Sequence, residues 1–248
     1  MIKRKTGKFT NCHYPIFDKY PSITAVSSTL ESPFGELETI TSDDTLYNHL
    51  DKTEKKWLNE IYVPQNDLVT IKQVHENSIF EAERPGFAGE YDGIVTISRN
   101  LFLRIVTADC IPVFLFDPDK EITGLVHAGW RSLHAEILPN VLDKMKAGFG
   151  SNPVNILAAF GPFIGDCCYE VGEDVAGKFS PDFTTKKGKG KYMLDLGRAA
   201  VKILIENGVL PGNIENSGEC TSCHPISYFS ARRGPYSKGR LIHIMGMN

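Results

Sequence analysis

The strongest constraint on the fold comes from three runs of β-branched and apolar residues in the middle of the chain. They occupy residues 68–74, 101–107 and 122–126, and a shorter run at 113–116 continues the second one. Each has the length and composition of an ordinary β-strand. Pro112 cannot donate a backbone hydrogen bond to a sheet, so we expect a turn at residues 109–112. Residues 155–160 predict a further strand.

Helical patterns lie between and after these runs. Apolar residues recur every four positions from Leu133 to Met145, which predicts a helix over residues 132–146 that Pro139 kinks or shortens. Two more helices are predicted over residues 44–61 and 196–207. Strands and helices that interleave in this way indicate an α/β or α+β domain.

Length and charge narrow the function classes. The chain has 248 residues, enough for one large domain or two small ones, and a net charge near −3. This is not the basic surface of a nucleic-acid binder. No stretch approaches the ~20 apolar residues of a membrane span, and no apolar run follows the basic start as in a secretory signal. We therefore expect a cytoplasmic enzyme without membrane or nucleic-acid partners.

His75, Cys110 and His127 each lie just after a predicted strand. Neighbouring strand ends in one sheet bring such residues together, and imidazole and thiolate are favoured zinc ligands. A catalytic zinc site uses three protein ligands and leaves a fourth position for water. From the residues alone, two alternatives stay open. The three are ordinary strand-end residues, or Cys110 is a nucleophile with a histidine as its base.

Longer motifs surround these residues in a fixed order. They are QVH at 73–75, TADC at 107–110, HAGWR at 127–131, GPFIGDCCYEVG at 161–172, CT at 220–221, YFSARR at 228–233 and GR at 239–240. This set resembles the YfiH-like family, long labelled multicopper polyphenol oxidoreductases or laccase-domain proteins. The resemblance covers about residues 68 to 245.

The resemblance implies one catalytic domain over residues 1–248, with a layered α/β/β/α fold and mixed sheets. It implies a zinc ion held by His75, Cys110 and His127. It further implies phosphorolysis of purine nucleosides and deamination of adenosine, so the partners would be purine nucleosides and phosphate.

The chain departs from the family pattern at three places. Ser132 follows the HAGWR motif where a glycine is usual, and Leu30 replaces an arginine in an N-terminal motif. Cys223-His224 also stands where other residues are common. If the missing arginine binds phosphate in relatives, phosphate is held differently here.

Several residues near the motifs are candidates for further roles. Asp109, beside Cys110, would move protons on the purine, hold a neighbouring side chain, or simply stabilise a turn. Asp92 precedes a glycine, which is typical of a turn. The arginines whose planar guanidinium groups would fit phosphate oxygens are Arg131, Arg232 and Arg233.

Two other functions are compatible with single features of the sequence. A multicopper phenol oxidase needs many histidines, commonly in His-x-His pairs, and this chain has seven histidines and no such pair. A Cys-His hydrolase acting on an amide or a cell-wall precursor would use the same cysteine and histidines without zinc.

The cysteines outside the triad predict no second metal site. Cys220 and Cys223 have the spacing of a zinc knuckle, but no second CxxC accompanies them. Cys167 and Cys168 are interpreted as two buried thiols. With only two thiols, a structural zinc site, which wants four ligands, is not expected.

Overall fold

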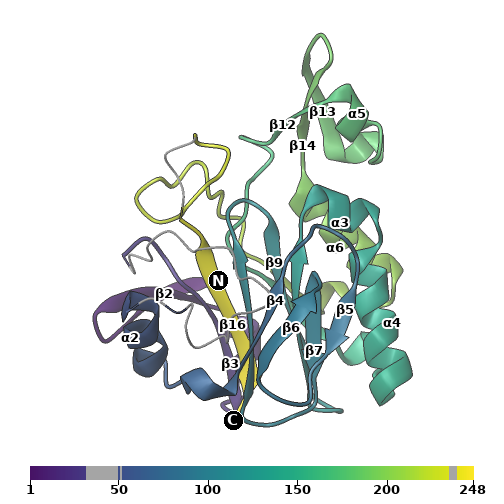
Figure 1. Cartoon of the computed structure of the whole chain (residues 1–248). Coiled ribbons are helices and arrows are strands. Elements are labelled where there is room, and N and C mark those ends of the chain that lie inside the picture. The colour runs from purple at the N-terminus through teal and green to yellow at the C-terminus, as the bar shows by residue number, and fades with distance from the viewer. Residues whose placement is uncertain (32–49, 51, 235–238) are drawn as a thin grey trace.

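The computed structural model describes residues 1–31, 50, 52–234 and 239–248, and these form four layers (Figure 1). Helix α2 (Lys52–Glu60) covers one face of a seven-stranded sheet. A six-stranded sheet packs on the other face of that sheet, and α3 (Trp130–His134), α4 (Ile137–Phe149) and α6 (Leu196–Glu206) cover its outer side. The predicted α/β/β/α layering is confirmed. That one domain spans residues 1–248 remains a prediction.

The seven-stranded sheet has the order β1-β2-β3-β16-β8-β4-β6 and is mixed, because β4 runs parallel to β8 and β6 while the other pairs are antiparallel. Its strands are β1 (Ile2–Thr6), β2 (Phe9–His13), β3 (Ile23–Ser27), β4 (Leu68–Lys72), β6 (Gly86–Glu90), β8 (Leu101–Thr107) and β16 (Leu241–Met247).

The six-stranded sheet has the order β15-β11-β9-β10-β7-β5 and is also mixed. Its strands are β5 (Ile79–Glu81), β7 (Gly93–Thr96), β9 (Ile111–Asp117), β10 (Ile122–Ala128), β11 (Leu157–Phe160) and β15 (Ile214–Asn216).

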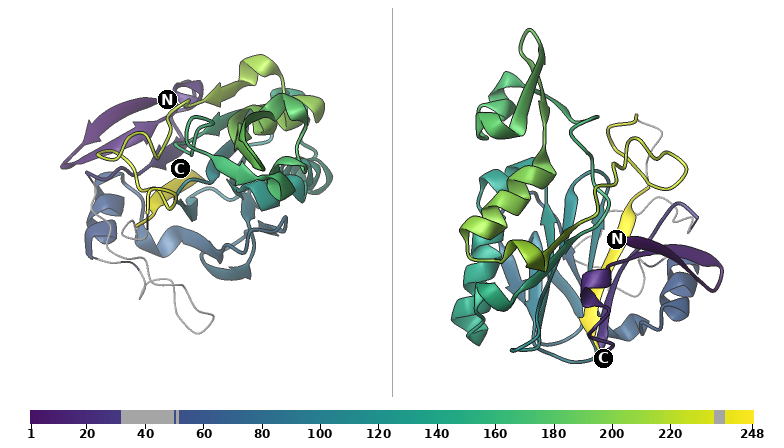
Figure 2. Two further views of the ribbon diagram at one scale, coloured as in Figure 1. Left: turned by 90° about the horizontal axis from the view of Figure 1, so that it is seen from above. Right: turned by 180° about the vertical axis from the view of Figure 1, so that it is seen from behind.

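A third, antiparallel sheet projects from one end of the molecule together with the short helix α5 (Glu173–Ala176), as Figure 1 and the right-hand view of Figure 2 show. Its strands are β12 (Glu170–Gly172), β13 (Thr184–Gly188) and β14 (Lys191–Leu194). Short 3-10 turns connect the elements at η1 (Pro15–Phe17), η2 (Gln65–Asp67), η3 (Pro153–Asn155), η4 (Pro181–Phe183) and η5 (Pro211–Asn213).

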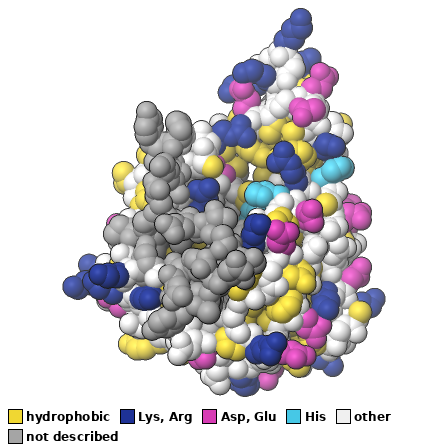
Figure 3. Space-filling view, viewed as in Figure 1, with side chains coloured by type: hydrophobic (Ala, Val, Ile, Leu, Met, Phe, Trp, Pro, Cys, Tyr) yellow, Lys and Arg dark blue, Asp and Glu magenta, His cyan; other side chains and the backbone are white. Residues whose placement is uncertain are grey.

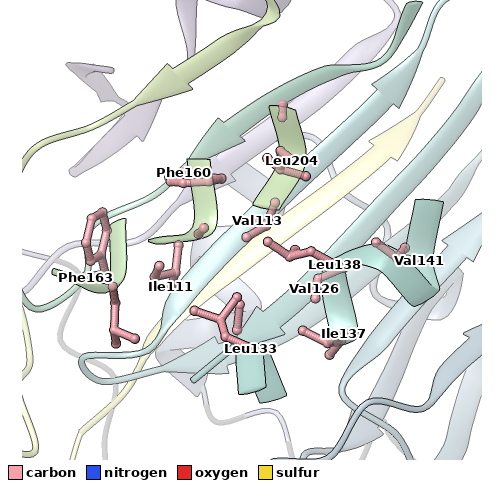
Figure 4. Packing of buried hydrophobic residues seen from close by; sticks show 14 of the residues in the cluster. Ile111, Val113, Val126, Leu133, Ile137, Leu138, Val141, Phe160, Phe163 and Leu204 are labelled. Atoms are coloured by element: carbon pink, nitrogen blue, oxygen red, sulfur yellow. The ribbon is translucent and has the colours of Figure 1, made fainter. Parts of the chain in front are cut away.

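Apolar side chains fill both faces of the six-stranded sheet. Towards the seven-stranded sheet, Phe114 and Leu125 pack with Leu103 and Met245. On the outer face, Val113 and Val126 and their neighbours meet the apolar stripes of α4 and α6 (Figure 4). Strands buried on both faces have continuous apolar sequences. This explains why β8, β9 and β10 were the clearest runs in the sequence.

Two details differ from the sequence-based expectation. The predicted helix over 132–146 is interrupted at Glu136, whose φ of 67° is left-handed, so that α3 and α4 are separate. Pro139 is the third residue of α4, where a backbone N–H has no partner within the helix, and it causes no kink. Pro112 lies inside β9, not in the turn, and its carbonyl accepts from the Gly161 amide at 3.0 Å.

The other predicted elements are present with small shifts. Helix α6 begins after Asp195, whose side chain accepts from the Arg198 amide, and it ends before Gly208 with φ 95°. Of the helix predicted over 44–61, α2 is present, whereas residues 44–49 and 51 lie outside the described residues. None of the helices in the described parts of the chain has the length and apolar composition needed to cross a membrane.

Candidate metal centre

Three different parts of the fold bring His75, Cys110 and His127 together. His75 follows β4, Cys110 lies in the turn from β8 to β9, and His127 lies inside β10. Strands β4 and β8 belong to the seven-stranded sheet, and β9 and β10 to the six-stranded one. The expectation that the ends of one sheet would gather them is therefore wrong. The centre lies where the chain crosses from one sheet to the other.

The possible ligand atoms of these three residues lie within 4.8 Å of one another. The two imidazole rings meet edge to face with centroids 4.7 Å apart. His127 is buried, Cys110 is half-buried and His75 is exposed. Histidine side chains reach the surface below the projecting hairpin (Figure 3). A group with this graded exposure can take up an ion or a small molecule from solvent.

Gly129 provides the room for the cysteine sulfur. A Cβ atom at this position would lie 2.9 Å from Cys110 Sγ and 3.4 Å from His75 Cδ2. The first distance is shorter than any normal contact, so a side chain at position 129 would displace the sulfur. This close approach gives a physical reason for glycine in the HAGWR motif.

Asp92 positions both histidines through hydrogen bonds to the His127 ring and to the backbone around His75. Its carboxylate accepts from His127 Nδ1 at 2.7 Å and from the backbone amides of Val74, His75 and Glu76 at 3.2, 3.0 and 2.7 Å. The first contact fixes the ring so that Nε2 is the nitrogen available to a ligand. The amide contacts hold His75 in its left-handed conformation, with φ 63°.

The electrostatics of Asp92 follow from these contacts. Burial by itself raises the pKa of the carboxyl, but the hydrogen bonds from His127, Glu76 and His75 outweigh burial and hold the pKa below its ordinary value. The interpretation of Asp92 as a turn residue was incomplete. Its Asp-Gly pair gave no signal for the contact with His127, which lies 35 residues further along the chain.

We predict that Asp92→Asn weakens metal binding at this centre about 10- to 100-fold, the usual range for losing the partner of a ligating histidine. Asparagine has similar size but only one acceptor oxygen and no charge, so it cannot satisfy the amides and His127 together. Competition with a chromogenic chelator on metal-stripped protein measures the affinity. Asp119→Asn, in the β9–β10 connection, is the matched control, and equal affinities for the two variants would contradict the prediction.

Cys110 and His127 influence each other's protonation. Burial by itself raises the pKa of the Cys110 thiol, but the charge and hydrogen bonds of His127 and His75 lower it to about 6. Burial by itself lowers the pKa of His127, but Cys110 and Asp92 raise it to about 9. The pair therefore favours a thiolate beside an imidazolium, and a thiolate is the form that binds metals or attacks electrophiles.

Asp109 anchors the C-terminal tail beside Cys110. One carboxylate oxygen accepts from Thr221 Oγ1 at 2.6 Å and the other from the Arg232 amide at 2.7 Å. Asp109 is buried and has a left-handed φ of 91°. Asp109, which was predicted to be catalytic, therefore positions Thr221 and Arg232 beside the centre.

The three candidate arginines have different surroundings. Arg232 donates to the Glu170 carbonyl at 2.6 Å and lies over the Tyr169 ring at 5.0 Å. Arg131 lies over the Trp130 ring at 4.4 Å, and its charge also reaches Tyr169. Arg233 donates to the carbonyls of Thr221 and Tyr228, so its guanidinium holds the tail together.

Tyr169 connects these cations with the metal centre. Burial is the main reason that its pKa is raised to about 12, and Cys110 and Asp109 add to the effect while Arg232 and Arg131 oppose it. The charges of all four groups therefore act on this ring. All three arginines are exposed residues, and Arg131 and Arg232 are the two whose charges act on Tyr169.

Comparison with known proteins gives a consistent result. The sequence model of a family described as multi-copper polyphenol oxidoreductase laccase matches residues 25–248. The chain is 34% identical over 195 residues to the purine nucleoside phosphorylase YlmD of Bacillus subtilis, covering 72% of this chain and 70% of the relative. A purine nucleoside phosphorylase of Deinococcus radiodurans is 34% identical over 186 residues, covering 73% and 71%.

Solved structures share the fold over almost the whole length. YfiH from Bacillus licheniformis superposes with a TM-score of 0.86 at 29% identity, covering 99% of each chain. YlmD from Geobacillus stearothermophilus gives the same TM-score at 25% identity, covering 99% of this chain and 98% of that one.

Proposed function

The chain belongs to the multi-copper polyphenol oxidoreductase laccase family, and we propose that it is a zinc-dependent purine nucleoside phosphorylase that also deaminates adenosine. Two relatives that are 34% identical are named purine nucleoside phosphorylases. The observation on which the proposal rests is the convergence of His75, Cys110 and His127, with Asp92 behind His127.

The donor set fits one zinc ion. Two imidazoles and a thiolate are ligands that zinc takes readily, and three protein ligands leave a position open. Copper also accepts this set, and the family name refers to it. A multicopper oxidase, however, holds several ions largely by imidazoles, whereas this group of three residues suits a single ion. We therefore propose zinc.

The residues around the site have separable functions in this proposal. Zinc would supply Lewis acidity, which makes water a usable nucleophile near neutral pH. Cys110 and His75 would hold the ion together with His127 Nε2, and Asp92 would fix the tautomer of His127. Gly129 keeps the space beside the Cys110 sulfur open.

For phosphorolysis, we propose that Arg232 and Arg131 bind inorganic phosphate. Phosphate would attack the ribose C1′ atom, and the purine would leave with the bonding electrons and a proton. Asp109 would place Arg232 by accepting its backbone N–H, and it remains our candidate for proton transfer to the purine. Leu30, where the family resemblance implies an arginine, donates its amide to the Ser227 carbonyl at 2.8 Å, so this departure lies beside the same tail.

We predict that Arg232→Ala raises the phosphate concentration for half-maximal release of hypoxanthine from inosine about tenfold to a hundredfold, equivalent to about 1.5–3 kcal/mol. Conversion of adenosine to inosine should be spared, because water and not phosphate is its nucleophile. Both reactions are followed by chromatography with and without phosphate. Arg99→Ala removes an exposed arginine that pairs with Glu121 and serves as the control.

The same assay tests the whole proposal. We expect no hypoxanthine without phosphate, adenosine deamination in either condition, and loss of both after chelation with recovery on adding zinc. Absence of both activities in zinc-loaded protein would overturn the proposed function. Equal losses of both activities in Arg232→Ala would show that this arginine supports the tail or the nucleoside instead of phosphate.

One observation favours a second candidate function. Asp92, His127 and Cys110 form a chain of contacts in the order of a carboxylate, a base and a nucleophile. A Cys-His hydrolase acting on an amide would use this chain, including one acting on a cell-wall precursor. Such an enzyme should keep its activity after chelation, which distinguishes it from the zinc enzyme.

A further inference from the structure

Four cysteines meet at a second place in the fold. Cys167 and Cys168 lie in the turn that follows the GPFIG segment, and Cys220 and Cys223 lie in the tail after β15. All four sulfur atoms lie within 4.8 Å of one another, and Cys223 Sγ is 3.4 Å from Cys167 Sγ and 3.3 Å from Cys168 Sγ. The sequence-based expectation counted only Cys220 and Cys223 as possible ligands and is therefore wrong. The interpretation of Cys167 and Cys168 as buried thiols is also wrong, because Cys167 is exposed and Cys168 is half-buried. The cysteine pair at 167–168 supplies the other two ligands.

We propose that Cys167, Cys168, Cys220 and Cys223 form a second, structural zinc site. Four thiolates fill the tetrahedral coordination of zinc and leave no open position, as in structural and not catalytic sites. Binding releases the protons of the four thiols to solvent, and the ion is taken up as Zn²⁺ without redox change. The proposal stands on this cluster alone and does not depend on the proposed function.

The spacing of the sulfurs suits a zinc ion. Four sulfurs at ~2.3 Å from zinc in a tetrahedron are about 3.8 Å from one another. The observed separations span this value, from 3.3 Å to no more than 4.8 Å. Hydrogen bonds between thiols are weak. Such weak bonds would not by themselves hold four thiols from two irregular segments together.

The surrounding backbone also faces the cluster. The backbone N–H groups of Gly165 and Cys223 donate to the Cys220 sulfur. Gly165 approaches the cluster closely, since a Cβ atom there would lie 3.3 Å from both Cys167 Sγ and Cys220 Cβ. Cys220 is buried, whereas Cys167 and Cys223 are exposed, which leaves a path for the metal from solvent.

A disulfide is the main alternative for this cluster. A bond would require about 2.05 Å between two sulfurs, and all four cysteines are free. Cys223 contacts both Cys167 and Cys168 at nearly equal distances, but it could bond to only one of them. A shared metal ion satisfies both contacts at once.

The site would fix the tail against the GPFIG segment. Between these segments, Thr221 donates its amide to the Phe163 carbonyl at 2.9 Å, and Phe163 donates to Glu219 at 3.3 Å. Thr221, next to Cys220, also donates its hydroxyl to Asp109, and Asp109 accepts from the Arg232 amide. A metal at the four cysteines would therefore hold the residues that place Arg232 beside the first centre.

Metal counting on reduced, zinc-loaded protein tests the proposal. We expect two zinc ions per chain in the natural sequence, one in Cys223→Ser, one in Cys110→Ala and none in the double variant. Cys12→Ser removes a cysteine outside both groups and should keep two. A single zinc ion in the natural sequence that persists in Cys223→Ser, or two ions in a folded Cys223→Ser, would overturn the proposal, whereas a single ion that persists in Cys110→Ala would contradict only the first centre.

Cobalt gives a readout that does not require Cys223→Ser to fold. Cys110→Ala loaded with Co²⁺ should show the strong sulfur-to-cobalt absorption of a tetrahedral thiolate site, and the four thiols should resist a thiol reagent until the metal is removed. A cobalt-loaded Cys110→Ala protein without this absorption, or with four freely reactive thiols, would overturn the proposal. A disulfide that persists under reductant and prevents metal uptake would do the same.

Discussion

Replacing Cys110 with alanine is expected to release the metal from the first centre and to lower kcat/KM for inosine phosphorolysis by more than about a hundredfold. The reason is that the loss of a ligand should exceed the roughly 10- to 100-fold effect typical of losing an outer partner such as Asp92. Two imidazoles remain, and these give zinc fewer protein ligands than any common catalytic site uses. Deamination of adenosine should fall with phosphorolysis, because both depend on the same centre.

The measurement combines steady-state kinetics with metal analysis on the same preparation. Cys12→Ser is the matched control, since Cys12 is a buried thiol that contacts Tyr228 and lies in neither cysteine-containing metal group. A Cys110→Ala protein that retains all its metal and more than a tenth of its activity would contradict the assignment of this ligand. Circular dichroism on both variants separates a local loss from unfolding.

The second large effect concerns stability. Glu54→Ala is expected to lower the free energy of unfolding by about 3–5 kcal/mol, the usual cost of leaving one partner of a buried ion pair without the other. Glu54 on α2 accepts from Arg104 Nε at 2.6 Å and from Nη2 at 3.0 Å, and the two side chains are 0% and 4% exposed. Arg104 lies on β8, so the pair joins the outer helix to the seven-stranded sheet.

Urea unfolding at a fixed zinc concentration measures this loss. Glu206→Ala is the matched control, because Glu206 forms an i,i+4 pair with Lys202 on the surface of α6. Removing an exposed pair of this kind should cost only about 0.3–0.5 kcal/mol. The double variant Glu54→Leu, Arg104→Met should regain much of the stability, because no unpaired charge stays buried. Equal unfolding energies for Glu54→Ala and Glu206→Ala would refute the prediction.

The sequence was informative wherever a signal was local. The continuous apolar runs of β8 and β10 arise because both faces of these strands are buried, and they were located from composition alone. Helix α6 agrees with the helix predicted over residues 196–207, which was expected to stop at Gly208. His75, Cys110 and His127 were predicted as metal ligands because each lies inside a short motif, in an order that resembles one family, and the structure brings the three together.

Local signals failed where partners are distant in the sequence. Asp92 has an ordinary turn sequence, and its importance arises only when β7 and β10 pair and bring it to His127. Pro112 was expected to end a strand because it lacks an N–H. In the structure it is the second residue of β9, where its carbonyl accepts a hydrogen bond from the Gly161 amide and no N–H is needed for this contact.

By itself, then, the sequence predicted the central strands β4, β8, β9, β10 and β11, the main helices and an α/β or α+β domain, because burial pattern is a property of neighbouring residues. The resemblance to one family implied the layering and the three residues of the first centre. Only the tertiary structure decided that these residues come from two sheets, that Arg233 holds the tail while Arg232 and Arg131 lie near Tyr169, and that four cysteines meet. The physical reason is that such contacts depend on how sheets stack and loops cross, and Cys168 and Cys223 are 55 residues apart with no local pattern that relates them.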